Sequence, residues 1–81
     1  MYEKSVADLA FMEGDFDKAA EMYLDGARNG DALASFNYGY CLWRGLGAPY
    51  DPKEAKSFFA FATTFCRNVS YYFRIIYLVN S

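Results

Sequence analysis

Apolar side chains recur every three or four positions along most of the chain, and no segment alternates regularly between apolar and polar residues. Three- and four-residue spacing places side chains on one face of an α-helix, whereas alternation is typical of a β-strand. The pattern therefore predicts an all-α fold. We expect helices at about 3–13, 16–29, 32–44, 52–66 and 69–79.

Short turn-forming sequences separate the expected helices, at residues 13–15, 29–31, 45–51 and 67–68. Gly30 stands where a helix end favours a left-handed residue. Asp51 is followed by Pro52 and Glu54, an arrangement typical of a helix start. Asp51 supplies a capping carboxylate, Pro52 suits the first turn, and the Glu54 side chain can accept the backbone N–H of the cap residue. Asp31 lacks such an acid three residues on, so we expect Asp51 to be the stronger cap.

The chain also resembles itself at two offsets. Ala7, Ala10 and Phe11 fall 32 residues before Gly39, Leu42 and Trp43, and Ala19, Met22, Tyr23 and Gly26 fall 36 residues before Ala55, Phe58, Phe59 and Ala62. The change of offset places a four-residue insertion in the loop at 45–51. The sequence thus predicts a helix–turn–helix unit that occurs twice and is followed by one more helix.

The residues of the two units are similar to those of known helical repeats. The first unit carries Gly14-Asp15-Phe16-Asp17-Lys18-Ala19 and Tyr23, and it resembles a tetratricopeptide repeat. The second resembles a Sel-one-like repeat through Ala34, Tyr38-Gly39, Leu42, Gly45-Leu46-Gly47, Asp51, Ala55, Phe58-Phe59 and Ala62. The resemblance implies a right-handed α-solenoid in one domain, 1–81, with units at about 1–30 and 31–67 and a terminal helix at about 68–81.

Small residues inside the expected helices have a physical explanation. Gly26 and Gly39 each weaken a helix by roughly 1 kcal/mol relative to alanine. Helices approach each other closely only where one side chain is very small, so these glycines are expected at helix crossings. The alternative is that the fold merely tolerates them.

Composition narrows the function classes. The chain has 81 residues, 54% of them hydrophobic and 21% aromatic, which argues against a disordered segment. Its net charge of −2 argues against a general nucleic-acid binder. The charge is uneven, with a balance of −5 over residues 1–31 and +3 over residues 32–81.

Residues that carry catalysis or bind metal are scarce. The sequence has no histidine, so it lacks the commonest general base and metal ligand. Cys41 and Cys66 form neither a zinc motif nor a disulfide framework; we expect Cys41 to be buried, and Cys66 is a candidate for a partly exposed, reactive thiol. The Gly45-x-Gly47 segment lacks the lysine and preceding strand of a phosphate loop. We therefore expect no enzyme activity, no metal and no cofactor.

The sequence also carries expectations about location. It opens with no basic-then-apolar signal peptide, and no apolar run approaches the ~20 residues of a membrane span. We expect a soluble protein of a reducing compartment, in the cytoplasm, with no membrane partner.

An aromatic stripe in the segment 32–44 is the strongest functional feature. Leu33, Phe36, Tyr40 and Trp43 are spaced three, four and three residues apart, so they share one face. The resemblance implies that the first helix of each unit lines a concave groove, which binds a peptide or helix of another protein. This groove would be lined by Lys4, Asp8, Phe11, Met12, Leu33, Phe36, Tyr40 and Trp43, with Arg44 beside them. The alternative is that the stripe of the segment 32–44 only builds core.

The segment 69–79 is apolar on nearly every side, unlike the polar helix that usually ends a solenoid. It supports a second hypothesis, in which the chain assembles with itself. The self-association residues would be Tyr72, Phe73, Ile76 and Val79. A third hypothesis is an acidic inhibitor whose first half imitates nucleic acid.

Overall fold

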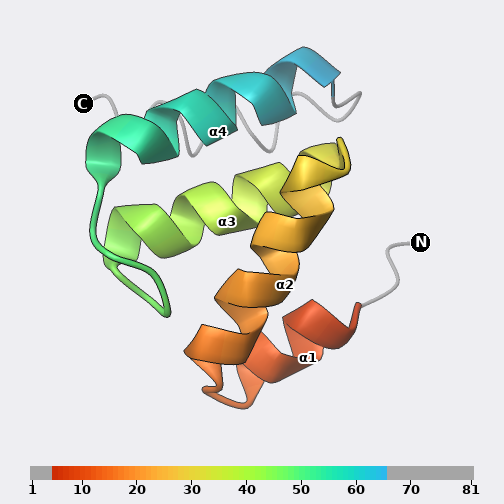
Figure 1. Ribbon diagram of the computed structural model, residues 1–81, viewed down its shortest axis with the longest axis vertical. Helices are drawn as coiled ribbons and strands as arrows, with labels where there is room; N and C mark the ends of the chain where they lie inside the picture. Colours follow the sequence, from red (N-terminus) through yellow and green to blue (C-terminus); the bar gives the residue numbers. More distant parts are fainter. Residues whose placement is uncertain (1–4, 66–81) are drawn as a thin grey trace.

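The computed structural model describes residues 5–65, and this part of the chain is helical with no strand. The helices are α1 (Val6–Met12), α2 (Phe16–Arg28), α3 (Ala32–Arg44) and α4 (Pro52–Phe65) (Figure 1). The predicted all-α class is confirmed for the described residues, and the four predicted helices in this range are found within three residues of their expected ends. The helix expected at 69–79 lies outside the described residues.

Glycine ends the first three helices in the same way. Gly14, Gly30 and Gly45 have left-handed backbones, with φ of +85°, +87° and +66°. In each case the following residue donates its N–H to a carbonyl five residues earlier, as from Asp15 to Ala10 and from Asp31 to Gly26. The predicted turns therefore form because glycine alone takes this conformation at little cost.

Aspartate then starts the next helix. The side chain of Asp15 accepts the N–H of Lys18, and that of Asp31 accepts the N–H groups of Leu33 and Ala34. The backbone N–H of each aspartate therefore bonds to the end of one helix, and its side chain caps the start of the next. The connections at 13–15 and 29–31 are short for this reason.

Consecutive helices pack against each other in chain order (Figure 1). α3 and α4 lie side by side, and α2 crosses steeply to α1 at the other end. A Cβ atom on Gly26 would lie 2.7 Å from Cβ of Ala34, and one on Gly39 would lie 2.9 Å from the ring of Phe59. Both glycines therefore stand at helix crossings, which confirms the packing role expected for them.

The buried side chains form two clusters of different composition. The α3–α4 cluster contains large side chains, namely Phe36, Leu42 and Phe59, together with Ala55 and Ala62. The α1–α2 cluster is made mostly of small residues; its members are Ala7, Ala10, Ala19, Ala20, Tyr23 and Cys41. Tyr38 and Ala48 pack against both clusters and connect them.

The loop between α3 and α4 reaches back to the beginning of α2. A Cβ atom on Gly47 would lie only 2.0 Å from the carbonyl oxygen of Phe16, so the two backbones are in direct contact. At the other end of the loop, Asp51 donates its N–H to the carbonyl of Leu42. The four-residue insertion expected in this loop thus fills space beside α2.

Candidate functional site

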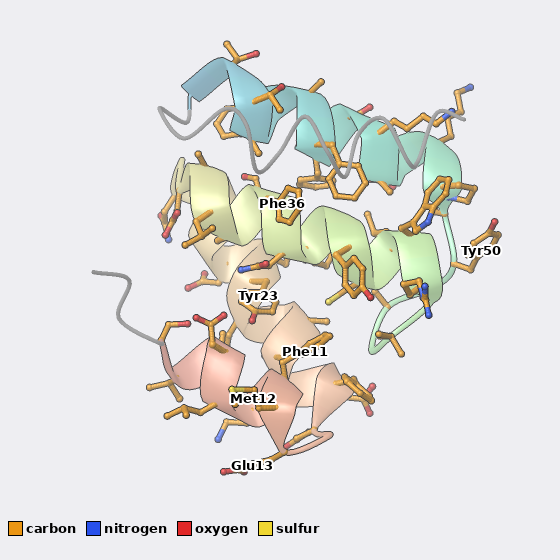
Figure 2. The ribbon with its side chains drawn as sticks, turned by 180° about the vertical axis from the view of Figure 1, so that it is seen from behind. Phe11, Met12, Glu13, Tyr23, Phe36 and Tyr50 are labelled. Atoms are coloured by element: carbon orange, nitrogen blue, oxygen red, sulfur yellow. The ribbon has the colours of Figure 1, made fainter. Side chains whose placement is uncertain are left out.

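A hollow of about 390 Å³ lies between the first turn of α1 and the first half of α3, with the middle of α2 as its floor. Its lining is mainly apolar and includes Val6, Met22 and Leu33, with Asn37 as a polar group. We call it the α1–α3 hollow. Figure 2 shows the ring of Tyr23 in the space between α1 and α3. Val6 is 58% exposed and Met22 36% exposed, so apolar side chains reach the solvent at the edge of the hollow.

A hydrogen bond at the floor of the hollow joins α1 to α2. The hydroxyl of Tyr23 donates to the carboxylate of Asp8, which also accepts the N–H of Ser5. The side chain of Ser5 accepts the N–H of Asp8 in return, and this capping box begins α1. Asp8 therefore fixes the start of α1 and the position of the Tyr23 ring at once.

The aromatic ring of Phe11 connects α1 to α3 further along. Its centroid lies 6.2 Å from that of Tyr40 and 5.0 Å from that of Phe16, and the latter pair meets edge to face. The guanidinium carbon of Arg44 lies 5.9 Å from the centre of the Tyr40 ring, within reach of a cation–π contact. The backbones of α1 and α3 do not approach each other, so side chains make this connection.

The structure thus brings together part of the predicted groove. Phe11 meets Tyr40 between α1 and α3, and Arg44 lies on the Tyr40 ring. Asp8 binds the hydroxyl of Tyr23, and Leu33 lines the hollow. Met12 is 63% exposed on α1. Lys4 and the expected self-association residues lie outside the described residues.

The placement of Phe36 in an open groove is wrong. Phe36 is only 3% exposed and packs on Phe59, with ring centroids 5.3 Å apart. Its side of α3 faces α4, because Gly39 on the same side lets the ring of Phe59 come close. Trp43 is half-buried and packs against the α3–α4 cluster, so much of its ring belongs to the core as well.

Of the residues that line the hollow, only Leu33 is among the predicted site residues, and Val6 and Met22 show which signal could have identified more. Val6 and Met22 lie on helices whose buried residues are mostly alanine, and neither side chain is among those buried residues. An apolar residue away from the buried stripe of an amphipathic helix is the signal that could have identified them. Asn37 carried no such signal, because a polar residue on α3 is unremarkable.

The titratable groups near the core show no activated nucleophile. Burial raises the pKa of the Cys41 thiol to about 11, and Cys41 is fully buried, as expected. Burial and the nearby carboxylate of Glu54 raise the pKa of Tyr38. Within residues 5–65, no group of three or more acidic or cysteine side chains is placed to hold a metal ion.

Comparison of the chain with protein-family models, curated proteins and solved structures finds no match. None of the helices in the described part of the chain has the length and apolar character that a bilayer crossing requires.

Proposed function

We propose that the chain is a protein-interaction module that holds a peptide or helix of another protein in the α1–α3 hollow. The hollow itself carries this proposal, because it is mainly apolar and has exposed apolar side chains at its edge. Ligand sites are typically concave and apolar with a few polar groups that set orientation. Asn37 in the lining and Arg44 near the end of the aromatic contact are the groups that would orient a peptide.

The repeat architecture supports the same proposal. The units α1–α2 and α3–α4 have equivalent small residues at their helix crossings, and their helices pack in chain order. We infer that they are two repeats of the Sel-one-like and tetratricopeptide type, arranged as the start of a right-handed solenoid. In such an arrangement the first helices of neighbouring units, α1 and α3, share one face, and the Phe11–Tyr40 contact joins the two helices.

Selection of peptides on the full 81-residue chain tests the proposal. Peptides chosen from a random display library should bind with dissociation constants in the micromolar range, on the order of 1–100 μM. Leu33→Ser removes an apolar wall of the hollow, so these peptides should bind at least about tenfold more weakly to that variant. Fluorescence anisotropy of labelled peptides measures both affinities.

Tyr50→Ser is the matched control, because Tyr50 is an exposed aromatic residue of the α3–α4 loop and not part of the hollow. It should leave peptide affinity within about twofold, and urea unfolding should show that both variants fold. Selected peptides that bind the Leu33→Ser variant as tightly as the original chain would contradict the proposal. So would a selection that yields no binding peptide.

A further inference from the structure

α1 and α3 occupy equivalent places in the two units, 32 residues apart in the sequence. The two helices are also equivalent in the way that they pack within their own units. Ala7 and Ala10 of α1 are buried beside α2, and their counterparts Gly39 and Leu42 are buried beside α4. Each first helix therefore turns the same side towards the second helix of its own unit.

α3 also packs on the preceding unit through another side. Cys41 is fully buried in the cluster that contains Ala19 and Tyr23 of α2, and Tyr38 packs against that cluster. A Cβ atom on Gly26 of α2 would touch Ala34, so α2 and α3 are in close contact. Cys41 thus marks the side of α3 that docks on α2, and Tyr38 stands at the edge of that side, where its ring also meets Phe58 of α4.

The same side of α1 is open. The residues of α1 that stand 32 positions before Tyr38 and Cys41 are Val6 and Leu9. Val6 is 58% exposed and Leu9 is 48% exposed, although both are apolar. Met12 is more exposed at 63%, but its counterpart is Arg44, which is itself exposed. The equivalence therefore singles out Val6 and Leu9, and leaves Met12 outside the docking side.

The charge of the first unit indicates what would cover this side. Between residues 5 and 31 the sequence has seven acidic and two basic residues, a balance of −5. A second copy that paired through the same side would bring two such halves together, and like charges oppose that contact. A helix with an apolar stripe and basic flanks matches both the apolar residues and the charge.

We propose that Val6 and Leu9 form a second docking surface of this chain, which adjoins the α1–α3 hollow at Val6 and extends outside it to Leu9, and that its partner is a basic amphipathic helix. The partner helix would lie against α1 in the place that α2 holds against α3. Leucine or isoleucine side chains would meet Val6 and Leu9, and lysine or arginine side chains would face the acidic residues of the first unit. Electrostatic attraction would make the association sensitive to salt.

A synthetic amphipathic peptide of about 18 residues, long enough to sustain a helix, is the probe. It carries leucines at three- and four-residue spacing and lysines elsewhere, with a fluorescein label. The full chain should bind it, and binding should weaken as salt is raised. The double variant Val6→Ser/Leu9→Ser should bind at least about tenfold more weakly. Both positions are exposed, so the variant should retain its helical circular dichroism.

Two single variants give matched controls. Met12→Ser alters an exposed apolar residue of the same helix, and Leu33→Ser alters the hollow; each should change the affinity less than about threefold. The same peptide with glutamate in place of lysine should not bind.

Equal affinity of the double variant and the original chain would overturn the proposal. A loss caused by Leu33→Ser instead would assign the peptide to the hollow. A concentration-dependent dimer that the double variant abolishes, seen by sedimentation, would show that a second copy covers this side and would overturn the assignment to a basic helix.

Discussion

Gly30 and Gly47 have similar left-handed backbones but very different surroundings. Gly30 has φ of +87°, and a Cβ atom there would meet nothing within 4 Å. Gly47 has φ of +69°, and a Cβ atom there would strike the carbonyl oxygen of Phe16. The first glycine is needed for its conformation alone, whereas the second is needed for conformation and for space.

We expect alanine to affect stability differently at the two positions. Gly30→Ala should lower the free energy of unfolding by about 1–2 kcal/mol, the cost of a left-handed non-glycine residue. Gly47→Ala should lower it by about 1–3 kcal/mol more, because the loop must also move away from α2. Urea unfolding followed by circular dichroism measures both values. Equal midpoints for the two variants would show that the loop at 45–51 does not hold α2.

The buried thiol of Cys41 makes stability depend on alkaline pH. Burial raises its pKa in the folded chain from 9.0 to about 11, so between these values the folded state holds a proton that the unfolded state releases. A rise in pH through this window therefore favours the unfolded state. The urea midpoint should fall as the pH is raised from about 9 to about 11, and the fall should be less steep in Cys41→Ala. Tyr38 acts in the same direction, so Cys41→Ala should retain part of the slope.

The helix starts differ in how many backbone donors their aspartates accept. Asp31 accepts two N–H groups, from Leu33 at 2.9 Å and Ala34 at 3.2 Å. Asp51 accepts one, from Glu54 at 3.1 Å. This geometry favours the opposite ranking to the one expected from the acid three residues after the cap. The number of donors reached depends on the direction of the carboxylate, which a sequence motif does not specify.

Asp31→Ala should therefore destabilise the chain at least as much as Asp51→Ala. The loss should be about 1–2 kcal/mol for Asp31 and about 0.5–1 kcal/mol for Asp51. Asparagine at each position is the control, because its side-chain oxygen can still accept these N–H groups. A larger loss for Asp51→Ala in urea unfolding would restore the ranking from sequence.

Helix periodicity and turn chemistry were sufficient to predict the four described helices, because glycine and aspartate mark their ends. Periodicity alone places the start of α1 near residue 3, whereas the Ser5–Asp8 capping box begins the helix at Val6. The site was harder to predict. Spacing places Phe36 and Tyr40 on the same side of α3, but it does not show that Phe36 is buried against α4 while Tyr40, at the edge of the same cluster, also reaches α1. That distinction depends on the angle between helices.

Across residues 5–65, the two core clusters differ in the size of their side chains. The α3–α4 cluster buries phenylalanine and leucine, whereas the α1–α2 cluster consists mostly of alanine. Burial of apolar area contributes roughly 25 cal/mol per Å², so large buried side chains hold their helices more firmly. α1 is also the shortest described helix, with 7 residues, and it packs along only one neighbouring helix.

This uneven core implies that the chain opens from its first helix. We expect the amide protons of α1 to exchange with deuterated water faster than those of α3. Separating α1 from α2 exposes mostly alanine side chains, so it costs little apolar burial. Exchange followed by mass spectrometry on peptic fragments measures the difference. Equal protection of α1 and α3 would instead indicate that the described helices open as one unit.

The same opening has a consequence for recognition. Val6 and Leu9 stand on the helix that we expect to detach most readily, so a partner that docks there would also hold α1 closed. Its affinity would be lowered by the fraction of molecules in which α1 is open. A substitution that stabilises α1 at a position other than Val6 and Leu9 would then change how tightly the partner binds without altering either contact residue.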